Sequence, residues 1–202
     1  RKCSNMTGPS FFQRVAGNRQ LLTAALFIAL TAHSSMVKGL IKEELNEVGA
    51  IPDASYTGYS VTELRSWYSA LGEKGRNGYI YMSIFDIFII GPIYVLLLTA
   101  QMVSVNAPKP LVNMPALVAF FDLSENLIHI FACYFYPTIP PISMMQFASV
   151  ATISKFVFLF LSLAIPFGLG VLKKLGEEEE SAQQTNTKEE SKDPSEEDKK
   201  TK

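Results

Sequence analysis

The chain has 202 residues, of which 48% are hydrophobic, and a formal net charge of −1 at pH 7. This length and composition allow one main domain, and the rest of the chain is neither long nor apolar enough for a second core. The charges form no basic patch that would support nucleic-acid binding, and two cysteines cannot make a disulfide framework.

Four apolar stretches dominate the chain, at about residues 21–37, 79–103, 111–136 and 144–172. Each is close to or above the roughly 20 residues that a helix needs to cross ~30 Å of hydrocarbon. We therefore predict an all-α fold in which residues 20–172 form a four-helix bundle within a lipid bilayer.

Charged segments flank this predicted bundle. Residues 1–19 form an N-terminal arm with basic residues and no acid. Residues 173–202 hold ten acids and seven lysines, with no apolar run after Leu175. Such a segment cannot bury enough apolar surface to offset its ordering entropy, so we predict a disordered tail.

The longest connection lies between the first two stretches. Ser60-Val61-Thr62-Glu63 fits a capping box, and apolar residues follow it at helical spacing. We predict an amphipathic helix over residues 61–72. Because it carries Trp67 and Tyr68 on its apolar side, we expect it to lie at the membrane–water boundary and to cap one mouth of the bundle.

Two proline motifs interrupt the apolar stretches. Gly91-Pro92 lies near the middle of the second, where such a pair usually kinks a membrane helix and frees a backbone carbonyl. Pro166, followed by Gly168 and Gly170, indicates where the fourth ends.

Basic residues near the span ends predict the orientation. Arg14, Arg19, Lys109 and the Lys173-Lys174 pair would share one side, so we expect both termini in the cytosol. The final Lys199-Lys200-Thr201-Lys202 resembles a dilysine retrieval signal, which would place the protein in the endoplasmic reticulum.

Ionisable residues inside the spans are the strongest functional signal. A charge at the bilayer centre costs on the order of 2.5–3.5 kcal/mol, so such residues turn towards a shared interior. Asp122, Glu125, Asn126 and His129 fall on one stripe about 100° wide on a helical wheel. The candidates for ligand binding or proton exchange are Asp86, Asp122, Glu125, Asn126, His129 and Lys155.

These charges do not balance, because Lys155 can neutralise only one carboxylate. Burial and like-charge crowding both disfavour an ionised carboxyl, so we expect at least one exchangeable proton near neutral pH. A purely structural network that holds the helices together stays an alternative. Asp122, Glu125 and His129 could supply three zinc ligands, but two histidines in the whole chain argue against a metal site, and we expect no metal and no cofactor.

Short motifs are scattered between positions 58 and 137. They are Gly58-Tyr59-Ser60, Leu71-Gly72, Gly75-Arg76, Tyr79, Asp86, Pro92-Ile93-Tyr94, Phe121-Asp122, Glu125-Asn126 and Tyr136-Pro137. In these motifs the chain resembles a family of small four-span integral membrane proteins of unassigned function. The resemblance implies the four-span fold and emphasises the same polar positions.

A looser likeness is architectural. Trp67-Tyr68 in the first long loop and Asp86 followed by Pro92 in the second span are similar to the arrangement in the sterol-isomerase and sigma-2-receptor group. That likeness implies four spans with cytosolic termini.

We expect a membrane protein whose polar pocket binds a lipid-like or cationic small molecule. Two alternatives are a proton- or cation-coupled carrier, and a structural accessory subunit of a membrane complex. No catalytic residue can be assigned, and the sequence favours a non-enzymatic role. It leaves open whether the chain forms a homo-oligomer or joins a larger membrane complex.

Overall fold

The computed structural model describes residues 14, 17–40 and 51–190, and it contains helices but no β-strand within these ranges. Four helical segments are long and apolar enough to cross a membrane. They are Arg19–Val37, Gly72–Ser104, Lys109–Tyr134 and Ile142–Glu179. The predicted all-α fold with four candidate spans is therefore confirmed, and each predicted stretch overlaps one of these segments along nearly all its length.

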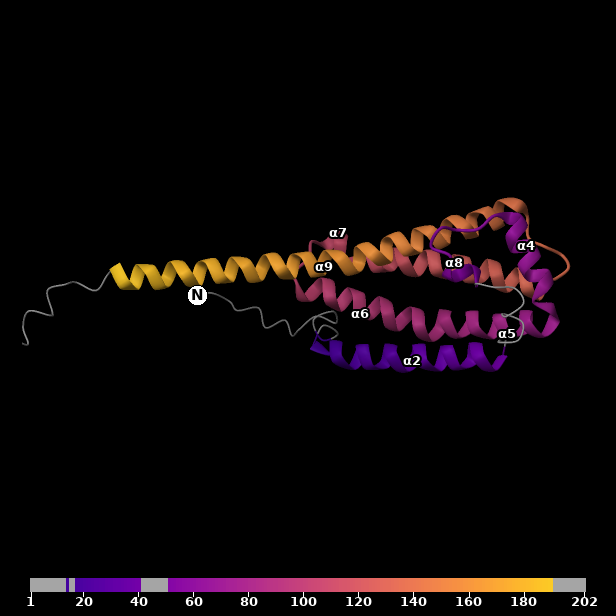
Figure 1. The fold of residues 1–202 in the computed structure, drawn as a ribbon, viewed down its shortest axis with the longest axis horizontal. Coiled ribbons are helices and arrows are strands. Elements are labelled where there is room, and N and C mark those ends of the chain that lie inside the picture. The colour runs from indigo at the N-terminus through magenta and orange to yellow at the C-terminus, as the bar shows by residue number, and fades with distance from the viewer. Residues whose placement is uncertain (1–13, 15–16, 41–50, 191–202) are drawn as a thin grey trace, which may run out of the picture.

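The long helices lie side by side in a bundle (Figure 1). Helix α2 (Arg19–Leu40) packs on α5 (Gly72–Phe85) and α6 (Gly91–Ser104), and few of its residues are buried. Helix α8 (Met114–Tyr134) packs most extensively on α9 (Ile142–Glu190). Most of the buried polar side chains belong to α8 and α9, so the polar interior lies away from α2.

The second span is a continuous helix that widens in its middle. Helix α5 passes through a π-helical turn, η2 (Asp86–Ile90), into α6, which begins with Gly91-Pro92. The Gly91 N–H donates to the Asp86 carbonyl, five residues earlier. Proline has no N–H, and its ring clashes with the carbonyl four residues back, so a widened turn accommodates Pro92 where a regular turn would not. The irregularity predicted at Gly91-Pro92 thus takes the form of a π turn that begins at Asp86.

Helix α4 (Val61–Ala70) closes one end of the bundle (Figure 1). Its capping box is present: the Glu63 N–H donates to Ser60 Oγ at 3.1 Å, and the Ser60 N–H donates to Glu63 Oε2 at 2.6 Å. The helix ends at Ala70 instead of residue 72, because Gly72 adopts a left-handed φ of +63° as the chain turns into α5.

The apolar face of α4 packs on the spans. Trp67 and Tyr68, which the sequence places on the apolar side of this helix, are both buried. They belong to a core cluster with residues from α4, α5, α8 and α9, namely Leu64, Leu71, Tyr79, Met82, Ala132, Cys133 and Met145. This packing ties the first loop to the bundle and fixes the residues just before α4.

Helix α9 does not end near Pro166 or at residue 172, as predicted, but continues to Glu190. Its extension leaves the bundle as a single helix (Figure 1). Neighbouring packing allows proline within membrane helices. Beyond the bundle the helix has charged side chains at i, i+4 spacing, such as Lys173 and Glu177 with Nζ and Oε1 3.9 Å apart. The predicted disordered tail is thus helical up to Glu190, while residues 191–202, with the dilysine motif, and residues 1–13 of the N-terminal arm lie outside the described residues.

Candidate functional site

The ammonium group of Lys155 lies among three carboxylates in the interior of the bundle. Its Nζ is 2.9 Å from Glu125 Oε2 and 3.1 Å from Asp122 Oδ1, and it contacts Asp53 Oδ1 directly. The Glu125 side chain is fully buried and that of Lys155 is 9% exposed. Asp122 and Glu125 face Lys155 together because residues three apart share one side of a helix. The predicted convergence of charged groups from separate spans is therefore what the structure shows.

A second branch of the network centres on His129. The Tyr68 hydroxyl lies 2.6 Å from His129 Nδ1, and the Tyr59 hydroxyl lies 3.1 Å from Nε2. Glu125 Oε1 is 3.5 Å from the same Nε2 and accepts a short hydrogen bond from the Thr152 hydroxyl. Both ring nitrogens of His129 therefore contact a tyrosine hydroxyl, and the ring links α8 to α4 and to the segment just before α4.

The third branch joins the second span to the network. The Asn126 side-chain amide donates to Asp86 Oδ2 at 3.0 Å, and the Tyr94 hydroxyl donates to Asp122 Oδ2 at 3.0 Å. Gly91 lies beside both contacts: an added Cβ would lie 3.2 Å from the Asp86 carbonyl oxygen of its own span and 3.9 Å from Asp122 Oδ2 on α8. All six candidates from the sequence thus lie in or beside one network, with Asp86 linked through Asn126 on α8 rather than directly to Lys155.

Asp53 was missed by the sequence analysis. It belongs to η1 (Pro52–Ala54), a single turn of 3-10 helix in the first long loop. Helical periodicity is the signal that predicted the other site residues, and a loop has none. Tyr59, Tyr68 and Tyr94 were also not singled out as site residues. Each of these tyrosines lies next to a helix end or a proline. The sequence is therefore equally consistent with a role at a helix boundary, in packing or in a site.

The groups of this network that lie outside the spans keep well-defined protonation states. Burial disfavours the ionised form of Asp53, but the Lys155 ammonium and its hydrogen bond outweigh burial and lower the pKa of Asp53. Burial, followed by the nearby charge of Glu125, raises the pKa of Tyr59, and burial raises the pKa of Tyr68. Asp53 therefore enters the network as a carboxylate, and both tyrosines enter it as neutral phenols.

A cavity of about 290 Å³, here called the inner cavity, adjoins the network. Its polar lining consists of Asp53, Asp86, Tyr94, Asp122 and Lys155, and its apolar lining of Ala54, Val118, Phe156 and Leu159. A second hollow of about 200 Å³ lies between α6 and α8, lined mostly by apolar side chains, and it shares Tyr94 and Asp122 with the inner cavity. The two hollows therefore meet at the Tyr94–Asp122 hydrogen bond.

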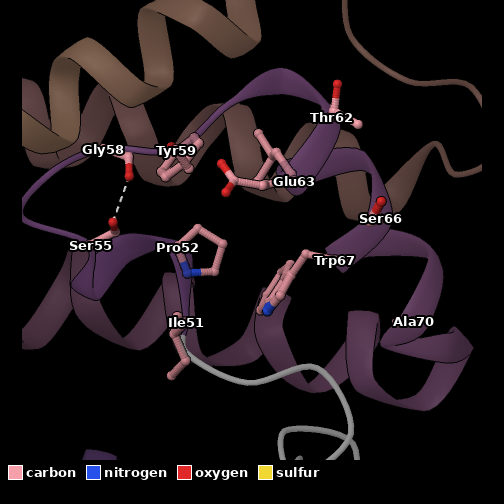
Figure 2. A pocket seen from close by; sticks show the side chains of 11 residues that line it. Ile51, Pro52, Ser55, Gly58, Tyr59, Thr62, Glu63, Ser66, Trp67 and Ala70 are labelled. Carbon is pink, nitrogen blue, oxygen red and sulfur yellow. Dashed lines mark hydrogen bonds between the residues drawn. The ribbon is translucent and has the colours of Figure 1, made fainter.

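A larger cavity of about 530 Å³, here called the outer cavity, lies between η1 and α4 (Figure 2). Figure 2 shows Glu63 and Trp67 of α4 facing Pro52 and Tyr59 across it. The backbone N–H of Ser60, followed by its hydroxyl, lowers the pKa of Glu63, so this exposed lining residue is a carboxylate. The outer cavity thus has one negative charge on an otherwise largely apolar and aromatic wall.

Three carboxylates of the network are close enough to hold a cation. Asp53, Asp122 and Glu125 each offer an oxygen, and these oxygens lie within 4.8 Å of one another. This set differs from the Asp122, Glu125 and His129 set that the sequence suggested. The Lys155 ammonium lies among the same three groups, so a metal ion would have to displace a resident positive charge.

Comparison with protein-family models, with curated proteins and with solved structures finds no match to this chain. The class of protein therefore follows from the fold and the site. Four apolar helices indicate a membrane protein, and a cluster of buried acidic residues around one lysine distinguishes its interior.

Proposed function

We propose that this protein binds a small molecule with a cationic group and an apolar, lipid-like part in its inner cavity. The observation that carries the proposal is the composition of the cavity wall. Asp86 and Asp122 line it together with Val118, Phe156 and Leu159, so one pocket offers both carboxylates and apolar surface. Pockets that combine an apolar wall with a few convergent polar groups are the usual form of a small-molecule site.

The charge of the network favours a cationic ligand. Asp53, Asp86, Asp122 and Glu125 supply four carboxyl groups, while Lys155 supplies one amino group. A bound ammonium group would supply a further countercharge in an interior where unpaired charges are costly. Asp86 and Asp122 would contact this group, Glu125 and Lys155 would set the charge around them, and Asn126 and His129 would hold the carboxylates in place.

The cavity sizes limit the ligand. The inner cavity, at about 290 Å³, is near the lower end of ligand-binding pockets, which span roughly 300–1,000 Å³. The adjoining hollow of about 200 Å³ gives room for an apolar chain beside Val95 and Leu123. A compact amine with one short hydrocarbon tail fits these dimensions.

The proposed orientation puts both termini in the cytosol. Arg19 Nη1 donates to Ser104 Oγ at 3.0 Å, and a Cβ on Gly170 would lie 3.9 Å from Val105 Cγ1. The start of α2, the end of α6 and the part of α9 before Lys173-Lys174 are thus at one end of the bundle, which supports the positive-inside orientation. Helix α4 and the outer cavity would then lie on the side of the membrane opposite the termini.

The test uses n-alkylammonium ions from butyl to decyl as probes and the matching n-alcohols as controls. A ligand at 100 times its Kd stabilises a protein by about 2.7 kcal/mol, which is visible as a rise of the melting temperature in detergent. We expect the amines, and not the alcohols, to stabilise the wild type, and Asp122→Asn to abolish the effect. Glu73→Gln, an exposed acid outside both cavities, is the matched control.

Equal stabilisation by amines and alcohols, or no stabilisation by any of them, would contradict the proposal. If Asp122→Asn does not fold, Asp86→Asn serves in the same comparison, since Asp86 lines the inner cavity without contacting Lys155 directly.

A second candidate is a proton- or cation-coupled carrier, favoured by the continuity of the network. Groups that can exchange a proton contact one another in a continuous chain, which runs from Tyr59 through His129, Glu125 and Lys155 to Asp122. Such a chain supports proton transfer between a loop and the interior. A pH-dependent flux in vesicles that Glu125→Gln abolishes would favour this function, and amine binding without any flux would favour the first.

A further inference from the structure

The segment of residues 51–59, here called the gate segment, lies between the two cavities. Its residues Ile51, Pro52, Ser55, Gly58 and Tyr59 line the outer cavity, as Figure 2 shows. The residues in between, Asp53 and Ala54, line the inner cavity. One short segment is therefore the shared wall of an outer cavity bordered by exposed residues of α4 and an inner cavity bordered by the charged network.

The gate segment is held together by its own hydrogen bonds. The N–H groups of Ala54 and Ser55 donate to the carbonyls of Ile51 and Pro52, at 3.0 and 2.9 Å. The Gly58 N–H donates to the Ser55 carbonyl at 2.9 Å, and the Ser55 hydroxyl donates to the Gly58 carbonyl at 2.6 Å. The segment can thus move as a unit without losing these internal bonds.

Two side-chain contacts fasten this unit to the spans. Asp53 pairs with Lys155 of α9, and Tyr59 contacts His129 of α8. The Tyr59 N–H also donates to Ser149 Oγ at 2.9 Å. The contact made by Asp53 joins two charged groups, which is the strongest type of hydrogen bond available here.

We propose that the gate segment opens and closes the inner cavity towards the outer cavity, with the Asp53–Lys155 and Tyr59–His129 contacts as its two latches. A solute or proton that exchanges with the inner carboxylates passes from the α4 end of the bundle through the outer cavity. Opening releases Asp53 from Lys155 and leaves Lys155 paired with Asp122 and Glu125, so the ammonium is not stranded in the interior. This inference concerns access and does not depend on which ligand binds.

The test measures how fast a thiol in the inner cavity reacts with a small cationic methanethiosulfonate reagent. Val118→Cys places the thiol on the inner-cavity wall at a position that is 1% exposed, in a background with Cys3 and Cys133 replaced by serine. The protein is held in lipid nanodiscs so that the reagent reaches both ends, and labelling is followed by intact mass spectrometry. If Val118→Cys does not fold, Leu159→Cys on the same wall replaces it.

Each latch is then weakened in turn. We expect Asp53→Asn to raise the labelling rate roughly tenfold, which corresponds to about 1.4 kcal/mol of gate-closing free energy, and Tyr59→Phe to raise it less. Glu73→Gln is the matched control, since it makes the same acid-to-amide change at an exposed site that lines neither cavity. In this control protein the Val118→Cys thiol should be labelled at the same rate as in the protein with an unchanged gate segment.

Ser66→Trp tests the route itself. Ser66 lies on the α4 wall of the outer cavity, so an indole there should slow labelling in the Asp53→Asn protein. An unchanged rate with Ser66→Trp, or an unchanged rate with Asp53→Asn, would overturn the proposal. A separate protein keeps Cys133 and lacks both Cys3 and Val118→Cys, so that this buried thiol, which lines neither cavity, reports unfolding. If Asp53→Asn speeds the labelling of Cys133 there as much as it speeds that of Val118→Cys, the gate is also refuted.

Discussion

Asp53 and Lys155 are 102 positions apart in the chain, yet the carboxylate of one directly contacts the ammonium of the other. Asp53 is the member of the carboxylate cluster that comes from outside the spans. This contact therefore couples the position of the first long loop to the charge state of the bundle interior.

Replacing Lys155 with methionine should destabilise the protein strongly. The change keeps most of the side-chain volume but leaves Asp122 and Glu125 without the ammonium that lies 3.1 and 2.9 Å from their oxygens. Removing one partner of a buried ion pair costs about 3–5 kcal/mol. Thermal unfolding in detergent at pH 7 measures the loss, and part of it should return at lower pH because protons can then neutralise the carboxylates.

Lys173→Met is the control for this change. Lys173 is exposed, and its pair with Glu177 on the α9 extension should contribute no more than about 1 kcal/mol. Equal melting temperatures for Lys155→Met and the wild type would contradict a buried ionic network.

Replacing Asp53 with asparagine should destabilise the protein in a pH-dependent way. The pKa of Asp53 is lowered in the folded protein below its unfolded value of about 3.9. Ionised Asp53 therefore stabilises the fold above the unfolded pKa, and this stabilisation is lost as the pH falls through the folded pKa. At pH 7 we expect Asp53→Asn to cost about 1.5–3 kcal/mol, typical of a hydrogen bond to a charged group.

The measurement is unfolding of both proteins between pH 3 and pH 7 in one detergent. The difference between wild type and Asp53→Asn should shrink below about pH 4, near the unfolded pKa of aspartate. A difference that grows on acidification would have the wrong sign for a carboxylate held by Lys155. Glu73→Gln, at an exposed site on α5, should follow the wild type throughout.

The polar face of α8 could be predicted because helix geometry alone places it. Asp122, Glu125 and His129 follow at three- and four-residue intervals inside an apolar span, and such residues must share a side. The cost of charges in hydrocarbon then predicts that this side meets Lys155. The sequence is sufficient to predict a side chain's position where the geometry of a regular helix and the cost of charge in the bilayer allow only one arrangement.

Asp53 and the end of α9 could not be predicted for two different reasons. The position of Asp53 depends on how η1 folds back on the bundle, which no periodic pattern encodes. Pro166 and the glycines after it predict the end of α9, although a membrane helix can pass through proline when neighbouring helices and side chains satisfy the freed backbone groups. Tertiary packing decides the first case, and the helical preference of the charged residues after Leu172 decides the second.

The two tyrosines beside His129 should differ in importance for stability. Tyr68 is fully buried, with its hydroxyl 2.6 Å from Nδ1, so Tyr68→Phe leaves that buried nitrogen without this partner. An unsatisfied buried polar group costs about 1–3 kcal/mol. Tyr59→Phe should cost less, because Glu125 Oε1 still lies 3.5 Å from Nε2. Chemical denaturation of both variants measures the difference, and a larger loss for Tyr59→Phe would contradict this ranking.

Alanine at Gly58 should destabilise the gate segment. Gly58 has a left-handed φ of +76°, and an added Cβ would lie 2.6 Å from Ser149 Oγ and 2.9 Å from Ile153 Cδ1. The backbone conformation alone costs an alanine about 1–2 kcal/mol. The clash also pushes the segment away from α9, where Ser149 Oγ accepts the Tyr59 N–H. Gly168→Ala, where a Cβ meets nothing within 4 Å, should be neutral or slightly stabilising.

A double-variant comparison separates the clash from the backbone strain. Ser149→Ala removes the oxygen nearest to the new Cβ, so Gly58→Ala should cost less in that background than in the wild type. Residues in contact are expected to show such a coupling, whereas independent sites add within about 0.3–0.5 kcal/mol. Strict additivity would mean that Gly58 does not press against α9, and the gate segment would then lie differently on the bundle.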